Sequence, residues 1–292
     1  MKILLLGAKG LMGRYLTEHW QREGIAVTGL SRAELDICDS ETSLHFLDHV
    51  NPTHVVNAAA LCRMEECELA PETSRAINTH APAWWSQACA ERGLNFVHMS
   101  TDYVFGGGVC VPYTEEDIPK PLSVYAQHKC EGEAAVLRNA TSTVVRLAWV
   151  FGSEGKTFMS MIPHLLQEQD VLEVAMGRTG GCLYAGYGAT MISDLILSNG
   201  VGLYHLTHHG VVTWQDFALE CKKQMLQRGL PIKSQEIRPA SLDTYRALQA
   251  KRPDYSVLST KKIERLVGKS ILPWQDGLNS YLEELFTGDH LI

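Results

Sequence analysis

Short apolar runs alternate with segments of helical apolar spacing through the first half of the chain. The runs predict buried strands at 2–7, 26–30, 54–59, 95–99 and 142–149. The segments between them predict helices at 11–22, 40–50, 70–92 and 124–138. Strands that alternate with helices of this length indicate parallel βαβ units. The pattern predicts an α/β fold with a Rossmann-type, doubly wound parallel sheet that helices cover on both faces.

The alternation of strand-like and helix-like segments becomes less regular after about residue 150. Gly177–Gly188 holds five glycines in twelve residues, which predicts a loop. Further on, the pattern predicts one more strand at 202–206 and helices at 214–228 and 274–286.

This organisation predicts two domains. We expect residues 1–150 to form an NADP(H)-binding domain, with a segment of about 184–227 returning to it. Residues 151–183 and 228–292 are expected to form a smaller, interleaved C-terminal substrate domain.

Composition narrows the class of protein. The 292 residues are 45% apolar and 20% charged, as in ordinary globular proteins. A net charge of -7 without a basic block argues against nucleic acid as a partner. No apolar run reaches the roughly 18 residues of a membrane span, and the N-terminus lacks a signal-peptide core. The eight scattered cysteines predict reduced thiols, so we expect a cytoplasmic protein without a membrane partner.

Three glycines follow the first predicted strand as Gly7-x-x-Gly10-x-x-Gly13. Glycine reaches the positive φ of a tight turn cheaply and leaves room for a pyrophosphate against the backbone. The next helix then offers its unpaired N–H groups to that anion, beginning at Leu11 and Met12. We therefore predict a dinucleotide site at this loop.

Ser31 and Arg32 follow the second predicted strand, where NAD-preferring sites carry an acidic residue. A guanidinium can pair with a 2′-phosphate through two hydrogen bonds. This favours NADPH, with NADH as the alternative cofactor; the competing interpretation is that Arg32 is a solvated surface charge.

Tyr125 and Lys129 are four residues apart in a predicted helix, so they project from one face. A lysine cation near a phenol lowers the phenol pKa, and the phenol can then protonate a carbonyl oxygen as hydride reaches the carbon. The alternative is an ordinary surface pair.

Two strand ends supply further candidates. Thr101 lies just beyond the predicted strand 95–99, where ligand groups gather in doubly wound sheets, and its hydroxyl can bond a substrate carbonyl. Asn57, Ala58, Ala59 and Ala60 end the preceding strand, and the small residues leave space for a cofactor.

Taken together, these motifs resemble the extended short-chain dehydrogenases, and most of all the dTDP-4-dehydrorhamnose reductase family. The similarity runs from residue 1 to about 286. It rests on Gly7-x-x-Gly10-x-x-Gly13, Leu35-Asp36-Ile37, Val56-Asn57-Ala58-Ala59-Ala60, Ser100-Thr101-Asp102-Tyr103-Val104-Phe105, Tyr125-x-x-x-Lys129, Arg146-Leu147-Ala148-Trp149-Val150-Phe151-Gly152, Gly202-Leu203-Tyr204-His205-Leu206, and Arg252-Pro253 with Ser256 and Leu258.

The resemblance implies an enzyme that transfers hydride from NADPH to the 4-keto carbon of a nucleotide-linked 6-deoxy-4-ketohexose. It implies Thr101, Tyr125 and Lys129 as the catalytic triad, with Lys129 also bonding the nicotinamide ribose. Asp36 and Ile37 are implied at the adenine edge of the cofactor site. The implied substrate contacts are Thr101, Asp102, Tyr103, Trp149, Arg178 and Arg252.

The second half departs from the family pattern. Members usually carry Asp-Gln-x-Gly-x-Pro-Thr where this chain has Gly177–Leu183, and Arg178 replaces a neutral amide. The cation suits a more anionic substrate. The alternative is that the sequence of this loop has changed without a functional consequence. Arg63 and Glu65 stand where the family has a different motif. The carboxylates that the family uses as metal ligands and at its dimer contact can therefore not be assigned in this chain. We expect no metal, and a homodimer is the candidate assembly.

Two other functions fit the same resemblance. A regulatory subunit of methionine adenosyltransferase is similar to this family and binds NADP without catalysis. A 4,6-dehydratase or 4-epimerase would keep the fold, but dehydratases place Asp-Glu after the active-site threonine. Here Asp102 is followed by Tyr103, which argues against dehydration.

Overall fold

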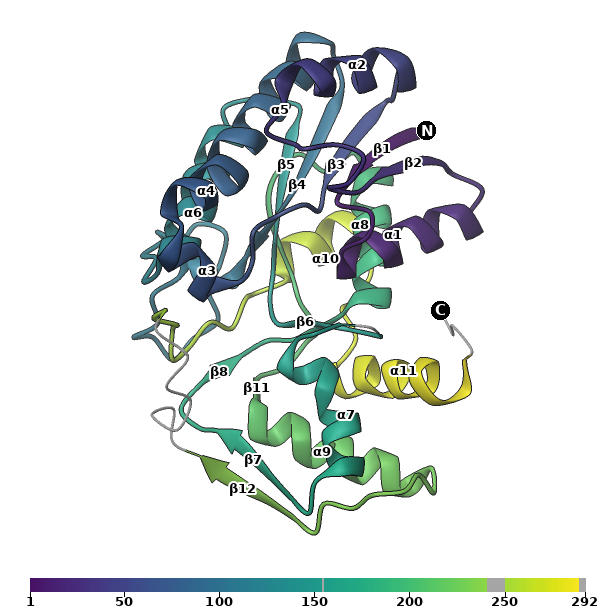
Figure 1. The fold of residues 1–292 in the computed structure, drawn as a ribbon, viewed down its shortest axis with the longest axis vertical. Coiled ribbons are helices and arrows are strands. Elements are labelled where there is room, and N and C mark those ends of the chain that lie inside the picture. The colour runs from purple at the N-terminus through teal and green to yellow at the C-terminus, as the bar shows by residue number, and fades with distance from the viewer. Residues whose placement is uncertain (154, 241–249, 289–292) are drawn as a thin grey trace.

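A six-stranded parallel sheet forms the upper half of the molecule in the computed structural model, which describes residues 1–153, 155–240 and 250–288 (Figure 1). Its strand order is β10-β5-β4-β3-β1-β2, and each neighbouring pair is parallel. The strands are β1 (Lys2–Leu6), β2 (Ala26–Leu30), β3 (His54–Asn57), β4 (Asn95–Thr101), β5 (Ser142–Leu147) and β10 (Gly202–Leu206). This order confirms the predicted Rossmann-type sheet.

Helices cover both faces of this sheet because its strands alternate buried side chains between the two faces. Ile3 and Leu5 pack with α1 (Leu11–Arg22) and α8 (Ala185–Leu197), whereas Leu4 and Leu6 pack with helices of the opposite side. All four side chains are fully buried. The helices opposite α1 and α8 are α2 (Ser40–Val50), α5 (Ala81–Glu91) and α6 (Val124–Val136).

The helix predicted at 70–92 contains a wider turn. The structure has α4 (Pro71–Arg75), the π-helical η1 (Ala76–His80) and then α5, after a short α3 (Met64–Leu69). Pro82 has no N–H to give to the Asn78 carbonyl one turn earlier. That carbonyl lies against α6, where a Cβ on Gly132 would come within 2.3 Å of it. A glycine on α6 thus lets the two helices approach each other.

Local caps explain why several helices begin where the pattern predicts. Asp39 accepts hydrogen bonds from two backbone amides of α2, and Ser123 accepts one from Ala126 in α6. Thr213 and Asp216 form a reciprocal capping box at the start of α9 (Trp214–Gln227).

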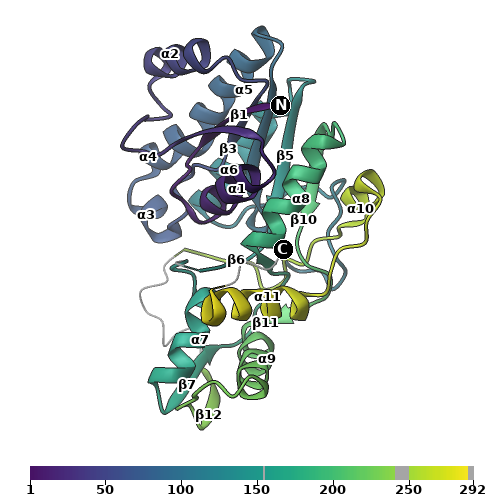
Figure 2. The same ribbon diagram turned by 90° about the vertical axis from the view of Figure 1, so that its right-hand side faces the viewer.

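A second, smaller body lies at the carboxyl end of the main sheet (Figures 1 and 2). It contains α7 (Phe158–Glu168), α9 and α11 (Trp274–Thr287), with the parallel pair β7 (Val171–Ala175) and β12 (Glu236–Ala240). The remaining short elements are β6 (Val150–Phe151), β8 (Thr179–Gly180), β9 (Leu183–Tyr184), β11 (Val212–Thr213), the 3₁₀ turn η2 (Asp102–Val104) and α10 (Lys261–Val267).

Two expectations for the second half need correction. The segment 184–227 returns to the sheet only through α8 and β10, because α9 packs against α7, β7 and α11. In the opposite sense, α10 packs beside β10 and α8. The loop predicted at Gly177–Gly188 contains β8, β9 and the first turn of α8. A Cβ on Gly188 would meet Leu183 at 3.0 Å, so this glycine serves close packing inside a helix.

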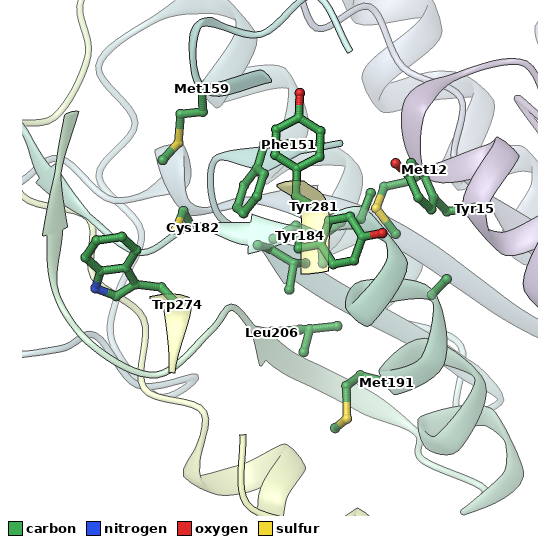
Figure 3. Packing of buried hydrophobic residues seen from close by; sticks show 14 of the residues in the cluster. Met12, Tyr15, Phe151, Met159, Cys182, Tyr184, Met191, Leu206, Trp274 and Tyr281 are labelled. Carbon is green, nitrogen blue, oxygen red and sulfur yellow. The ribbon is translucent and has the colours of Figure 1, made fainter. Parts of the chain in front are cut away.

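The two bodies share one aromatic core, part of which Figure 3 shows. Phe151, Tyr184 and Tyr281 pack against one another there. Tyr15 of α1 and Tyr184 of β9 both donate hydrogen bonds to the buried Glu284 carboxylate of α11. The first and the last long helices of the chain are therefore tied together directly.

Among the described residues, no helix combines the length and the apolar character that crossing a membrane requires.

Candidate active site

The glycine loop has the close contacts that its spacing predicts. Gly7 has a φ of +82°, and a Cβ there would lie 2.7 Å from the backbone nitrogen of Ala59. A Cβ on Gly13 would lie 2.1 Å from the Gly7 carbonyl oxygen. Gly10 caps α1 without any side-chain hydrogen bond, which leaves the first-turn amides of Leu11 onward to a ligand. The loop therefore forms a backbone cradle with no room for side chains at Gly7 or Gly13.

The segment after β2 contains a carboxylate, Glu34, that was not among the predicted site residues. Ser31 donates to Glu34 from its backbone N–H at 2.8 Å and from its hydroxyl at 2.6 Å, and these bonds lower the pKa of Glu34. Arg32 is exposed beside this pair. Asp36 is also exposed, whereas Ile37 is buried and its carbonyl accepts from Trp85. The signal for Glu34 was available, because an acidic residue near this strand end binds ribose hydroxyls.

Asn57 at the end of β3 fixes the wall that faces Gly7. Its side-chain oxygen accepts the N–H of Ala59 at 3.0 Å, and the side chain is fully buried. Ala58 and Ala59 are half-buried, and Ala60 is exposed. Ala58 and Ala59 thus lie beside the cradle while Ala60 is exposed, and their contact with a cofactor stays a prediction.

Lys129 reaches from α6 to the neighbouring strand β4. Its Nζ donates to the Met99 carbonyl at 2.6 Å and lies 3.0 Å from Nε2 of His98. Burial lowers the pKa of Lys129 to about 8, and Glu133 opposes that shift. The pKa of the buried His98 is also lowered, by burial and then by Lys129, so this imidazole is neutral. These contacts hold the ammonium in one place against the sheet.

Tyr125 and Thr101 meet at the junction of α6 and β4. Burial raises the pKa of Tyr125 well above its usual value, and a hydrogen bond with Thr101 opposes the rise. Burial dominates this shift and Thr101 provides the opposing contact, so the effect of Lys129 on the pKa of the phenol stays a prediction. β4 extends two residues beyond its predicted end, so Thr101 is the last residue of the strand. Tyr125 is a protonated phenol here, which suits a proton donor.

Asp102 lies directly behind Thr101 and is 2% exposed. The Thr101 hydroxyl donates to one carboxyl oxygen at 3.2 Å, and Ser256 donates to the other at 2.5 Å. Burial raises the pKa of Asp102 to about 7, against the effect of these hydrogen bonds. Ser256, which belongs to the motif around Arg252, was not predicted to contact Asp102.

Three predicted substrate contacts converge from distant parts of the chain. Burial raises the pKa of Tyr103 to about 12, while Arg252 and Arg178 oppose that rise because their charges lie near. Arg252 pairs with Glu65 at 2.7 Å. The Arg178 guanidinium lies over the Trp214 ring, 5.6 Å from its centre. Neither Glu65 nor Trp214 was predicted at the substrate site.

Trp149 connects this group with Asp102. It has a φ of +35°, which is rare for a large side chain. A Cβ on Gly180 would lie 2.7 Å from the Trp149 ring and 3.2 Å from the Ser256 hydroxyl. Gly180 therefore allows the indole to approach the Ser256–Asp102 hydrogen bond.

The clustered histidines have separate surroundings. His205 lies 3.3 Å from Nη1 of Arg146, and His208 stacks on Tyr187. Within the described parts of the chain, no three His, Cys, Asp or Glu side chains are grouped as a metal site requires.

Comparison with known proteins places this geometry in a family. The model described as RmlD substrate binding domain matches residues 1–287. The chain is 31% identical over 291 residues to the dTDP-4-dehydrorhamnose reductase of Aggregatibacter actinomycetemcomitans, which covers 96% of this chain and 97% of that protein. A crystal structure of a dTDP-4-dehydrorhamnose reductase from Clostridium acetobutylicum ATCC 824 superposes with a TM-score of 0.89 at 29% identity, over 98% of this chain and 99% of that one. The dTDP-4-dehydrorhamnose reductase of Bacillus anthracis str. Ames in complex with NADP gives 0.88 at 27% identity, over 97% and 100%.

Proposed function

The chain belongs to the family described as RmlD substrate binding domain, and on that premise we propose that it is an NADPH-dependent reductase of nucleotide-linked keto sugars. The proposed reaction is reduction of the 4-keto group of a 6-deoxy-4-ketohexose, by analogy with the named relatives. The observation that carries the proposal is that two side chains of α6 contact the carboxyl-terminal end of β4: Tyr125 at Thr101, and Lys129 at the Met99 carbonyl.

The cradle fits a dinucleotide because a Cβ at Gly7 or Gly13 would fill the space against the backbone. We propose that the amides from Gly10 to Gly13 hold the pyrophosphate. The remaining proposed cofactor contacts are Ser31, Arg32, Asp36, Ile37, Asn57, Ala58, Ala59, Ala60, Tyr125 and Lys129. NADPH, when bound, supplies the hydride.

The protein's own contribution is the proton and the orientation of the carbonyl. Tyr125 carries a proton at neutral pH because burial raises its pKa, and it gives that proton to the developing alkoxide. The Thr101 hydroxyl holds the carbonyl oxygen at the end of β4. We propose that Lys129, held by its hydrogen bond to the Met99 carbonyl, supplies the cation that stabilises the phenolate left behind.

The two bodies divide these tasks in the proposal. The six-stranded sheet and its helices carry the cradle and the proposed reacting groups. Gly180 belongs to β8, and Arg178 directly precedes that strand. Asp102, Tyr103, Trp149, Arg178 and Arg252 are the proposed sugar-side contacts.

Tyr125→Phe tests the proposed function. We expect NADPH oxidation with dTDP-linked 4-keto sugars to fall roughly 10²–10⁴-fold, because the proton donor is removed. Binding of NADP⁺, measured by calorimetry, should persist. Tyr187→Phe in α8, a phenol in contact with His208, is the matched control and should keep turnover. Unchanged turnover in Tyr125→Phe would contradict the proposal, and NADP⁺ binding without turnover in the wild type would favour a regulatory subunit.

A further inference from the structure

His98 carries an inference about Lys129, and its effect on turnover rests on the proposed function. We propose that His98 is a positioning residue whose two ring nitrogens bind Asn57 and Lys129, so that the tautomer of the ring and the charge of the lysine are coupled. The imidazole then sets the pH range in which Lys129 is a cation that can stabilise the phenolate.

The three side chains form one chain of hydrogen bonds in the interior. Asn57 on β3 and His98 on β4 are neighbours in the sheet register, and Nδ2 of Asn57 lies 3.2 Å from Nδ1 of His98. At the other side of the ring, Nε2 lies 3.0 Å from Nζ of Lys129. Each of the three residues is 1% exposed or less, so bulk water competes little for these bonds.

A backbone amide fixes the direction of the first bond. The N–H of Ala59 can only donate, and it donates to the side-chain oxygen of Asn57 at 3.0 Å. The amide nitrogen of Asn57 therefore faces His98, and because this nitrogen too can only donate, Nδ1 of the ring has to accept. The same Ala59 nitrogen is the atom that a Cβ on Gly7 would approach to 2.7 Å. The chain of hydrogen bonds thus begins at the wall of the cofactor cradle.

The bond at the other end of the ring suits an uncharged lysine better than a charged one. His98 is a neutral imidazole, which has one N–H and one bare nitrogen. With Nδ1 accepting from Asn57, the proton is on Nε2 and points at Nζ. An amine can accept that proton while it donates to the Met99 carbonyl, whereas an ammonium has only donors. The ammonium therefore requires the other tautomer, which gives up the bond from Asn57.

Other groups set a background that does not depend on the tautomer of the ring. Burial lowers the pKa of Lys129 to about 8, and Glu133 and Cys62 oppose that shift. The ionisable groups that act on Lys129 or Tyr125 from the neighbouring elements are Glu133 of α6 with its partner Arg146 of β5, Cys62 after β3, Cys67 of α3 and Asp102 of η2. A change confined to the Asn57–His98 bond leaves all of them in place.

NMR of the histidine ring nitrogens tests the coupling directly. We would label the full-length protein with nitrogen-15 in its histidines and record it without cofactor, over about three pH units around the pKa of Lys129. His98→Phe assigns the signals. The proton of the His98 ring should move from Nδ1 to Nε2 as the pH rises, although the ring stays neutral, and Lys129→Met should hold it on Nε2 throughout. A wild-type tautomer that stays the same over this range would overturn the inference.

Asn57→Asp should reverse the direction of the chain. A carboxylate can only accept, so it binds both the Ala59 N–H and a proton on Nδ1, which leaves Nε2 to accept from the ammonium. Turnover of a dTDP-linked 4-keto sugar with NADPH should be lost at high pH as Lys129 loses its charge, since the raised pKa of Tyr125 keeps the phenol protonated there. In Asn57→Asp this alkaline limit should move upward by about one to two pH units, the size of a charged hydrogen bond.

Two comparisons separate the ring from the added charge. In a His98→Phe background, Asn57→Asp should move the alkaline limit by less than about half as much, because only the charge remains; phenylalanine keeps a flat ring against Phe96. Asn95→Asp is the matched control, because Asn95 contacts His54 at 3.2 Å across the same two strands, at the other end of β3, and it should leave the limit unchanged.

Equal shifts with and without the His98 ring would overturn the inference. The NMR experiment needs neither cofactor nor substrate, so it stands apart from the proposed function. A tautomer that follows Lys129 in a protein without turnover of any keto sugar would support the coupling and count against the proposed function alone.

Discussion

Two buried cationic regions of this molecule differ in how completely they are paired. Under α6, Arg146 forms a salt bridge with Glu133 at 2.7 Å, and Lys129 is bound to the Met99 carbonyl beside them. Near β8, Arg178 is buried to a similar degree but keeps an unpaired N–H, in the part of the chain that the structure describes.

The difference is one of charge compensation: the pair under α6 is complete within the protein, whereas one Arg178 nitrogen has no partner among the described residues. A fully paired cluster keeps its geometry before substrate arrives, as a reacting site needs. An unpaired buried charge costs stability until a ligand completes it. The two regions should therefore respond in opposite ways to the loss of a charged side chain. Four experiments test this comparison.

Removing one partner of the paired region should have the largest effect. Glu133→Leu leaves Arg146 buried without its carboxylate, so the free energy of unfolding should fall by about 3–5 kcal/mol. Urea denaturation measures this loss. The double variant Glu133→Leu/Arg146→Met should lose less than the single one, because no lone charge remains. A loss below about 1 kcal/mol in the single variant would show that water reaches the pair.

Asp102 should make stability depend on pH. Its pKa is about 7 in the folded chain and near 3.8 without burial, so between these values the folded state holds more protons than the unfolded state. The free energy of unfolding should therefore fall as the pH rises through this window, by up to roughly 4 kcal/mol, and then level off. Asp102→Asn should lose that slope in denaturation curves taken across the window. If the dependence of unfolding free energy on pH is unchanged in Asp102→Asn, other titrating groups cause it.

Arg178→Met should stabilise the free protein, in contrast to Glu133→Leu. Replacing an unpaired buried cation with an apolar chain of similar length should raise the free energy of unfolding by about 1–2 kcal/mol. Thermal denaturation without ligand measures the change. A lower melting temperature would mean that the Trp214 contact already compensates the charge.

Arg32 should give the smallest effect, because it is exposed and solvent screens its charge. Arg32→Ala should weaken NADPH binding about tenfold, or about 1.4 kcal/mol, and NADH binding less. Glu34→Gln is the matched variant and should strengthen NADPH binding, since a carboxylate near a 2′-phosphate repels it. Equal changes for both cofactors in Arg32→Ala would rule out the phosphate contact.

Local signals predicted the sheet side of the molecule well. The structure has α1 and α2 at the predicted residues 11–22 and 40–50, because their apolar spacing and the Asp39 cap lie within the segment itself. Thr101 was predicted from one strand end, and Tyr125 and Lys129 from one helix face, so short-range rules were enough to place all three beside β4.

The substrate side depends on contacts between distant segments, which no local pattern contains. The buried Arg178 lies over the ring of the distant Trp214, and Ser256 reaches Asp102 across 154 positions in the sequence. Glycine was also ambiguous there: Gly188 lies inside α8 for close packing, although the same residue usually breaks helices. The π-helical turn before Pro82 likewise depends on a glycine of a different helix.

The Glu284 carboxylate in α11 has a consequence for how the chain folds. It joins Tyr15 across 269 positions, so the helix that follows the glycine cradle contacts a helix that is synthesised much later. Contacts of such long sequence separation form late, because the intervening chain must be ordered first. A chain interrupted before α11 would leave the buried Tyr15 hydroxyl without this carboxylate as its acceptor. The two bodies of the molecule therefore complete each other's buried polar contacts only after the segment of α11 has been synthesised.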